Sequence, residues 1–343
     1  MKASMIERFA TWESFLGLLT LAVLGYATLA VPNFATVFNI SQAIAGASER
    51  ALIVLPMVLL IIAREIDLSV ASILALCSVV FGVLIREGVS LEVAIAFALL
   101  VGVTAGAFNG VLVTYLGLPS LVVTLGTMAM FRGIGYIILG TGSVNEFPDS
   151  FTDFGINTLG ESPIPWTIVP FLVLAPAFAI MLQQSAIGRR IYALGGSPDT
   201  ALYAGVRVAR IRLCLFIVSG LVCAIASIVF TARLANSRAD NAIGLELDVI
   251  TIVLLGGVSV FGGKGKLTGV FLALILIATL RNVLGLSQIG GDAQGTVIGL
   301  LLILSLLMST TAQRFYSTFQ SALTPDRKAG RGSSGRPDTA KTS

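Results

Sequence analysis

Residues 188–231 read GRRIYALGGSPDTALYAGVRVARIRLCLFIVSGLVCAIASIVFT, a basic segment that runs directly into a long apolar one. As a helix, the apolar part from residue 211 is long enough to cross the roughly 30 Å hydrocarbon core of a bilayer. The basic part contains a single acid, Asp199, and five arginines: Arg189, Arg190, Arg207, Arg210 and Arg212. Because positive residues concentrate in cytoplasmic loops of membrane proteins, this stretch predicts a membrane span preceded by a cytoplasmic segment.

The composition of the chain agrees with an integral membrane protein. Hydrophobic residues make up 56% of its 343 residues and charged residues only 12%, against about 25% in soluble domains. The sequence has no histidine, which excludes Ser-His-Asp and Cys-His catalysis. Its three cysteines lie apart in apolar runs, so we expect no metal site, no cofactor and no catalytic residues.

The apolar runs predict an all-α protein with about ten transmembrane helices. They cover residues 13–31, 44–63, 67–85, 91–113, 119–139, 165–183, 211–231, 248–262, 267–285 and 293–310. The first run is longer than the apolar core of a cleavable signal peptide, so we interpret it as a span. Ten spans place both termini on one side of the membrane.

The charged residues of the connections predict the orientation. The 140–164 connection is acidic without Lys or Arg, whereas 184–210, the turn with Lys264 and Lys266, and the tail are basic. Under the ten-span count the basic segments share one side, so both termini are expected in the cytoplasm of a bacterial inner membrane. We expect a transmembrane domain over residues 1–320 and a disordered basic tail over 321–343.

A weak internal similarity suggests two inverted repeats of five helices, over about 13–139 and 165–310. Glu65-Ile66-Asp67-Leu68 opens the third predicted span, and Glu246-Leu247-Asp248-Val249 opens the eighth. Because five spans separate the two copies, they would cross the membrane in opposite directions, as in many transporters. The alternative is that both sequences only place charge at helix ends.

A short helix is predicted inside the basic segment, from Pro198 to Ala204. Ser197 is suited to cap its N-terminus, Pro198 to its first position, and Asp199 to the positive end of its dipole. Gly205 is suited to end it in a left-handed conformation. A helix of about two turns is marginal by itself, so it needs a groove on a partner or the membrane surface.

Polar residues within the spans are candidates for a solute path: Asn109, Thr124, Arg132, Asn282 and Thr296. Each of the four neutral residues either hydrogen-bonds a hydroxylated solute or bonds a neighbouring helix. Arg132 either lines that path or extends to the outer headgroups, since a charge inside a span is costly. Arg64, Glu65 and Asp67 are expected to neutralise one another at the start of the third span.

Two glycine-rich patterns need separate interpretations. Gly102, Gly106 and Gly110 recur every four residues on one face of a span, which predicts close helix packing. The 262–268 stretch contains Gly-Lys but lacks the spacing of a phosphate-binding loop. ATP hydrolysis is therefore expected only in a separate subunit.

Four stretches resemble the permease subunits of bacterial ABC importers for monosaccharides, of the ribose/xylose/rhamnose type. They are Ile66–Ser72, Gly117–Thr127, Tyr192–Pro198 and Gly256–Gly263. Many members of that family have Gly-Gly where this chain has Arg64-Glu65. The resemblance implies a homo- or heterodimer of permeases in membrane lipid, a cytoplasmic ATP-binding subunit and an external sugar-binding protein, without nucleic acid.

The resemblance also implies roles for the short helix. It would be the coupling helix that docks on the ATPase, with contacts from Ser197, Pro198, Asp199, Tyr203 and Gly205.

Two other functions remain open from the sequence. One is an ion-coupled secondary transporter with cation sites at Glu65, Asp67, Glu246 and Asp248, although these acids lie at predicted span ends. The other is an ABC permease for branched-chain amino acids, whose doubly charged substrates call for paired charges within the membrane. The sequence analysis finds no such pairs.

Overall fold

The computed structural model describes residues 12–291, 293–301 and 303–304, which form helices without a strand among them. Seven helical segments are long and apolar enough to cross a membrane. They are α2 (Trp12–Ala30), α3 (Val37–Ile62), α5 (Leu91–Thr114), α6 (Ser120–Leu139), η1 with α8 (Trp166–Ile168 and Val169–Gln184), α11 (Val208–Leu234) and α13 (Leu267–Leu286). The prediction of a helical membrane protein is confirmed.

Five further helices are shorter. They are α4 (Val70–Arg86), α7 (Asp149–Ile156), α9 (Ala186–Gly196), α10 (Pro198–Tyr203) and α12 (Leu245–Leu255). Residues 291, 293–301 and 303–304 are also helical, and those from 293 on belong to the predicted tenth span. The rest of that span and the predicted tail at 321–343 lie outside the described residues.

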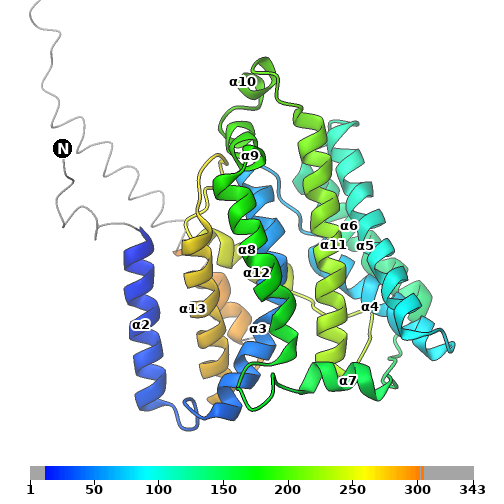
Figure 1. Ribbon diagram of the computed structural model, residues 1–343, viewed down its shortest axis with the longest axis vertical. Helices are drawn as coiled ribbons and strands as arrows, with labels where there is room; N and C mark the ends of the chain where they lie inside the picture. Colours follow the sequence, from blue (N-terminus) through cyan, green and yellow to red (C-terminus); the bar gives the residue numbers. More distant parts are fainter. Residues whose placement is uncertain (1–11, 292, 302, 305–343) are drawn as a thin grey trace, which may run out of the picture.

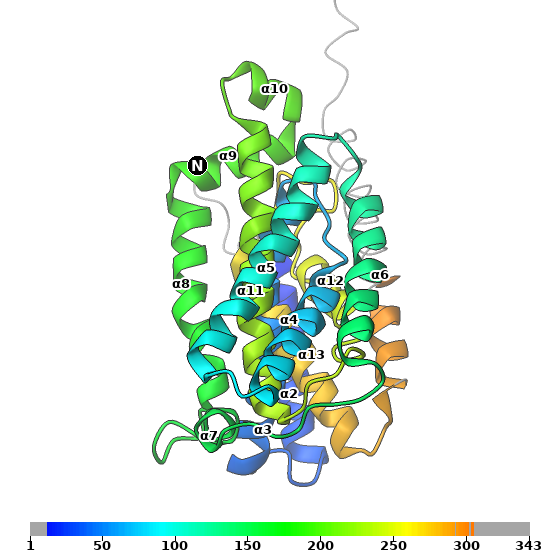
Figure 2. The same cartoon turned by 90° about the vertical axis from the view of Figure 1, so that its right-hand side faces the viewer.

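The bundle has two distinct ends, which Figure 1 shows at the top and bottom of the view. Helices α9 and α10 project from one end, called here the α10 end, and α7 lies across the other, the α7 end. Helices α3 and α11 are the most buried of the long helices, whereas α2 packs on the outside against α13. Figure 2 shows α8 and α6 on opposite flanks of this core.

The glycine stripe of α5 packs closely, as predicted, and its partner is α11. A Cβ atom at Gly102 would lie 2.6 Å from the Cβ of Ala224, and one at Gly106 would lie 3.1 Å from the Cα of Gly220. A Cβ at Gly220 would in turn overlap the carbonyl oxygen of Gly102. The two backbones therefore approach as closely as small residues allow, which replaces the missing hydrophobic drive between helices in lipid.

Two of the predicted spans are broken helices in the structure. Helix α12 is only about 16 Å long at 1.5 Å per residue, and α4 about 25 Å, so neither crosses 30 Å of hydrocarbon. Irregular segments, residues 63–69 and 235–244, lead into them within the bundle. The predicted span 248–262 was too long at its C-terminal end, because Gly257, Gly262 and Gly263 adopt positive φ angles and turn the chain there.

Helix α3 contains a proline in its interior. Pro56 has no N–H to donate to the carbonyl of Leu52, which locally weakens the helix in its buried half. The helix nevertheless continues to Ile62 because its neighbours enclose it, with every side chain from Ala51 to Ile62 buried.

We expect Gly106→Ala to lower stability by about 1–3 kcal/mol, since the added methyl overlaps the α11 backbone. Thermal unfolding of the detergent-solubilised protein measures this. Gly25→Ala in α2 is the matched control, because a Cβ there meets no atom within 4 Å. Its stability should stay unchanged or rise slightly. Equal melting points for the two variants would contradict the close α5–α11 packing.

Candidate functional site

Helix α6 satisfies the backbone of the first irregular segment. The Ile66 N–H donates to Ser120 Oγ at 3.2 Å, and Thr124 Oγ1 donates to the Ile66 carbonyl at 3.1 Å. Thr124 is fully buried in this contact. The backbone groups at residue 66 therefore need α6, because the chain is not helical there.

Asp67 is the centre of a buried hydrogen-bond network in the same segment. Its carboxylate accepts from Ser69 Oγ at 2.6 Å and from Ser219 Oγ at 3.0 Å. Asn109 Nδ2 donates to Ser69 Oγ at 2.8 Å. These neutral donors compensate a fully buried acid. The predicted mutual neutralisation with Arg64 and Glu65 is wrong, because each of the three has other partners. Asp67 accepts from the two serine hydroxyls, Arg64 donates to carbonyls of α9, and Glu65 pairs with an arginine of α11.

The second irregular segment is also bound by α6. Arg132 Nη1 donates to the carbonyls of Ala239 at 2.8 Å and Asn241 at 2.6 Å. Residues Ser237 and Val144 exchange two backbone hydrogen bonds beside it. In this conformation the guanidinium does not extend to the headgroups, since non-helical carbonyls inside the bundle take its hydrogen bonds.

The five predicted path residues do not converge on one site. Asn109 and Thr124 both bind segment 63–69, and Arg132 binds segment 235–244. Asn282 exchanges two hydrogen bonds of 2.9 Å with Asn39. Thr296 is exposed. A role in transport for each of them stays a prediction.

A charge network inside the bundle was missed by the sequence analysis. Asp248 of α12 lies between two arginines, with Arg50 Nε at 3.0 Å and Arg281 Nη2 at 2.6 Å. Glu49, 1% exposed, pairs with Arg233 Nη2 at 2.9 Å. The expected lack of paired charges within the membrane is therefore wrong. The signal was visible, because each of these arginines interrupts or borders an apolar run.

The charge network borders a polar cavity of about 280 Å³ between α3, α13 and the helix that contains Gln294. Its polar lining is Gln42, Arg50, Arg233, Arg281, Asn282 and Gln294. The five charged residues of the network sum to +1 (three arginines, two acids), so the cavity is rich in donors. Buried Nε atoms of Arg233 and Arg281 lack a hydrogen-bond partner among the described residues.

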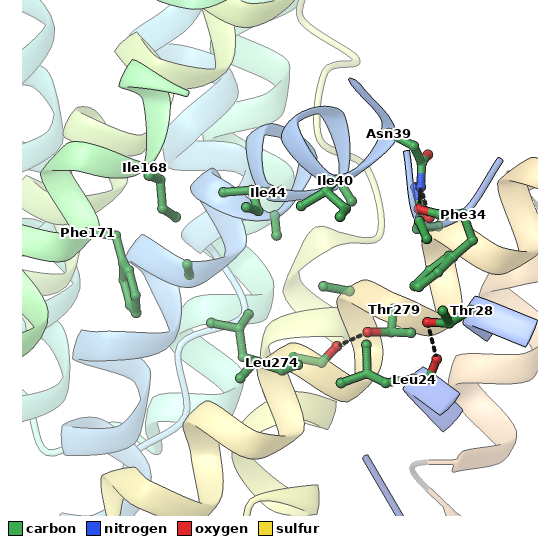
Figure 3. A pocket seen from close by; sticks show the side chains of 17 residues that line it. Leu24, Thr28, Phe34, Asn39, Ile40, Ile44, Ile168, Phe171, Leu274 and Thr279 are labelled. Atoms are coloured by element: carbon green, nitrogen blue, oxygen red, sulfur yellow. Dashed lines mark hydrogen bonds between the residues drawn. The ribbon is translucent and has the colours of Figure 1, made fainter. Parts of the chain in front are cut away.

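A second cavity on the same α3–α13 seam is apolar. It has a volume of about 460 Å³ and lies between α2, α3, α8 and α13 (Figure 3). Its threonines are turned to their own helices, since Thr28 donates to Leu24 and Thr279 to Ile275. With Phe34 and Phe171 in its wall, this cavity suits hydrocarbon, not a hydroxylated solute.

The α10 end carries the predicted short helix. Helix α10 begins at Pro198, and Ser197 Oγ accepts from the Thr200 N–H at 3.3 Å. Gly205 follows with φ 79°, as predicted. Leu202 and Tyr203 are 60% and 91% exposed, so the helix presents an uncovered apolar tip.

Helix α9, which the sequence analysis did not predict, attaches α10 to the bundle. Arg64 donates to the carbonyls of Gly195 at 2.6 Å and Gly196 at 2.7 Å, at the C-terminus of α9. The Tyr192 hydroxyl donates to the Gly265 carbonyl at 2.7 Å. Burial raises the pKa of Tyr192, so this donor stays protonated at neutral pH. Glycine at 195 is required, since a Cβ would overlap the Ile62 carbonyl.

Arg64 holds this position in a conformation that favours glycine. Its φ of 67° is left-handed, and the adjacent Glu65 forms an ion pair of 2.7 Å with Arg212 of α11. The left-handed backbone at Arg64 is unfavourable for a residue other than glycine. It occurs together with the two charge-assisted hydrogen bonds from the Arg64 side chain to α9.

Removing the Arg64 side chain should loosen α9, and the replacement should decide by how much. Arg64→Ala loses both hydrogen bonds and keeps the left-handed strain. Arg64→Gly loses the same bonds but relieves the strain, so it should be about 1 kcal/mol more stable than Arg64→Ala. Thermal unfolding and limited proteolysis within residues 186–207 measure the difference. Equal stability would show that the backbone at 64 is not strained.

Asp248→Asn should destabilise the bundle by about 2 kcal/mol, because it leaves partly buried Arg281 without a carboxylate and Arg50 with only Glu49 at 3.9 Å. The double variant Asp248→Asn, Arg281→Gln should recover part of that loss. Asp240→Asn, which breaks an exposed pair with Arg238, is the control and should change little. A melting point of Asp248→Asn no lower than that of the control would remove the network as a stabilising element.

Comparison with known proteins identifies the family. Residues 39–306 match the family described as "Branched-chain amino acid transport system / permease component". The L-arabinose transport system permease protein AraH of Escherichia coli K12 is 34% identical over 305 residues, covering 88% of this chain and 92% of the relative. The D-allose transport system permease protein AlsC of the same organism is 34% identical, covering 87% and 91%. The autoinducer 2 import system permease protein LsrD of Yersinia enterocolitica is 34% identical, covering 74% and 78%.

No solved structure matches the chain. The relatives are transport permeases and not enzymes, and the match covers most of the chain on both sides. The chain therefore belongs to this family of multi-pass membrane permease components of transport systems.

Proposed function

We propose that this chain is the membrane-spanning subunit of an ATP-driven importer for a monosaccharide or a similarly hydroxylated small solute. The observation that carries the proposal is the α10 helix, whose exposed apolar tip is attached through α9 to the most buried helix of the bundle. A surface of this kind transmits movement from a docked partner. The names of the relatives, for arabinose, allose and autoinducer 2, support the solute class.

The partner at α10 is a cytoplasmic ATP-binding subunit, with contacts expected from Ser197, Pro198, Asp199, Tyr203 and Gly205. On this basis we assign the α10 end to the cytoplasm, and we propose the cytoplasmic side for both termini as well. The charges support that orientation. Arg189 and Arg190 lie on α9, and the turn with Lys264 and Lys266 lies beside it, since Tyr192 of α9 binds Gly265, whereas the 140–164 connection is acidic. A second permease subunit completes the membrane part of the assembly. A solute-binding protein docks at the α7 end.

The two broken helices support an inverted repeat. Helices α4 and α12 are each preceded by an irregular segment inside the bundle, and each has a buried aspartate near its start, Asp67 and Asp248. Asp67 receives a bond from α11, and Asp248 from α3. Discontinuous helices in corresponding halves are typical of transporters that bind solute at the interface of the repeats.

The polar cavity is the proposed section of the solute path. Its amide and guanidinium groups offer donors to hydroxyl oxygens, and a volume of about 280 Å³ admits a single sugar ring. Arg50, Arg233 and Arg281 already share Asp248 and Glu49, which limits the attraction for a carboxylate. The alternative substrate class, branched-chain amino acids, is less supported, since the relatives named above are permeases for arabinose, allose and autoinducer 2.

The coupling assignment is tested by truncating the tip of α10. The double variant Leu202→Ala, Tyr203→Ala should reduce co-purification of the ATP-binding subunit about tenfold or more, because aromatic anchors dominate interfaces. The protein itself should keep its melting point, since both side chains are exposed. Leu29→Ala, 90% exposed on α2, is the control. Unchanged association and transport in the double variant would reject α10 as the docking site.

A further inference from the structure

Helices α8, α9 and α11 enclose a groove of about 770 Å³ near the α10 end, which meets the coupling surface only at Gly205. Its lining is divided. Arg190, Arg207 and Arg210 lie where α9 and α11 begin to leave the bundle, and Met181, Cys214 and Val218 line the part below them. Figure 2 shows α8 and α11 as separate columns that α9 joins at this end.

One face of α11 contains both kinds of side chain in order of depth. Residues 210, 214 and 218 recur every four positions, so they lie on one face of the helix. Cys214 lies about 6 Å and Val218 about 12 Å farther into the bundle than Arg210. The groove thus changes from cationic to apolar over the distance that separates a phospholipid headgroup from its acyl chains.

The three groove arginines are not used by the protein itself. Among the described residues none of them forms an ion pair, whereas neighbouring Arg212 pairs with Glu65 and Arg64 binds α9. The start of α11 adds positive potential, since its N-cap residue Arg207 forms no side-chain cap hydrogen bond. Three uncompensated guanidinium groups above an apolar wall are complementary to a phosphodiester with hydrocarbon attached.

We propose that this groove binds one anionic phospholipid, with its phosphate on Arg190, Arg207 and Arg210 and its acyl chains along Met181, Cys214 and Val218. The lipid would fill the space under α9 and bind the segment that leads to α10. The groove is distinct from the polar cavity and from the exposed tip of α10.

Native mass spectrometry of the full chain in detergent micelles tests the proposal, with phosphatidylglycerol and phosphatidylcholine as probes. We expect one retained phosphatidylglycerol per chain and none of the zwitterionic lipid. Arg190→Gln and Arg210→Gln should each weaken retention about fivefold, because each removes the attraction of one arginine for the anionic headgroup. Arg189→Gln is the matched control, because Arg189 is exposed on α9 and does not line the groove.

The thiol of Cys214 reports the position of the lipid. Cys214 is exposed, whereas Cys77 and Cys223 are buried. The rate of maleimide labelling therefore measures how accessible the groove is at Cys214. Phosphatidylglycerol should slow labelling, and inorganic phosphate should not. Equal retention of the two lipids, equal retention by Arg189→Gln and Arg210→Gln, or loss of the lipid when the ATP-binding subunit docks would each overturn the proposal.

Discussion

The constraint on which this structure depends is that its backbone leaves helical geometry twice inside the bundle. A peptide group there has no water to bond, so other helices must supply its partners. Helix α6 supplies them for both irregular segments, through Ser120 and Thr124 at one level and Arg132 at another. The cost of placing a guanidinium within a span is offset because two carbonyls accept from it. Removing these α6 side chains would leave backbone groups in both breaks, before α4 and α12, without their partners.

Much of this was predictable from sequence, and the part that was not has a physical reason. Long apolar runs identified a helical membrane protein, the glycine stripe indicated close packing of α5, and Ser197 and Gly205 marked the ends of α10, because these signals are local. The partners of Asp248, Arg233 and Arg64 lie 33 to 198 residues away along the chain. Hydropathy also reports only apolar length, so it joined α12 to the glycine turn that follows it. Helix α9 was not predicted because glycines, which are weak helix formers, make up part of its buried face.

The two aspartates near the starts of α4 and α12 receive opposite treatment. Asp67 has hydroxyl donors and no cation within its hydrogen-bond network, while Asp248 has two arginines. Asp67 is therefore enclosed by neutral hydroxyl donors, whereas the network around Asp248 borders a donor-rich cavity. Similar backbone breaks thus have different surroundings: the one at Asp67 is packed among helices, and the one at Asp248 lies beside a polar cavity.

Pro56 gives α3 a consequence beyond its own missing hydrogen bond. Arg50 lies on one side of it and Ile62, against which α9 rests, on the other. Helix α3 therefore has a point of lower rigidity at Pro56, where one intrahelical hydrogen bond is missing. Tilting the Ile62 arm by about 10° would displace its end by roughly 1.5 Å at 1.5 Å rise per residue, enough to disturb contacts with α9 while the Arg50 arm stays in register.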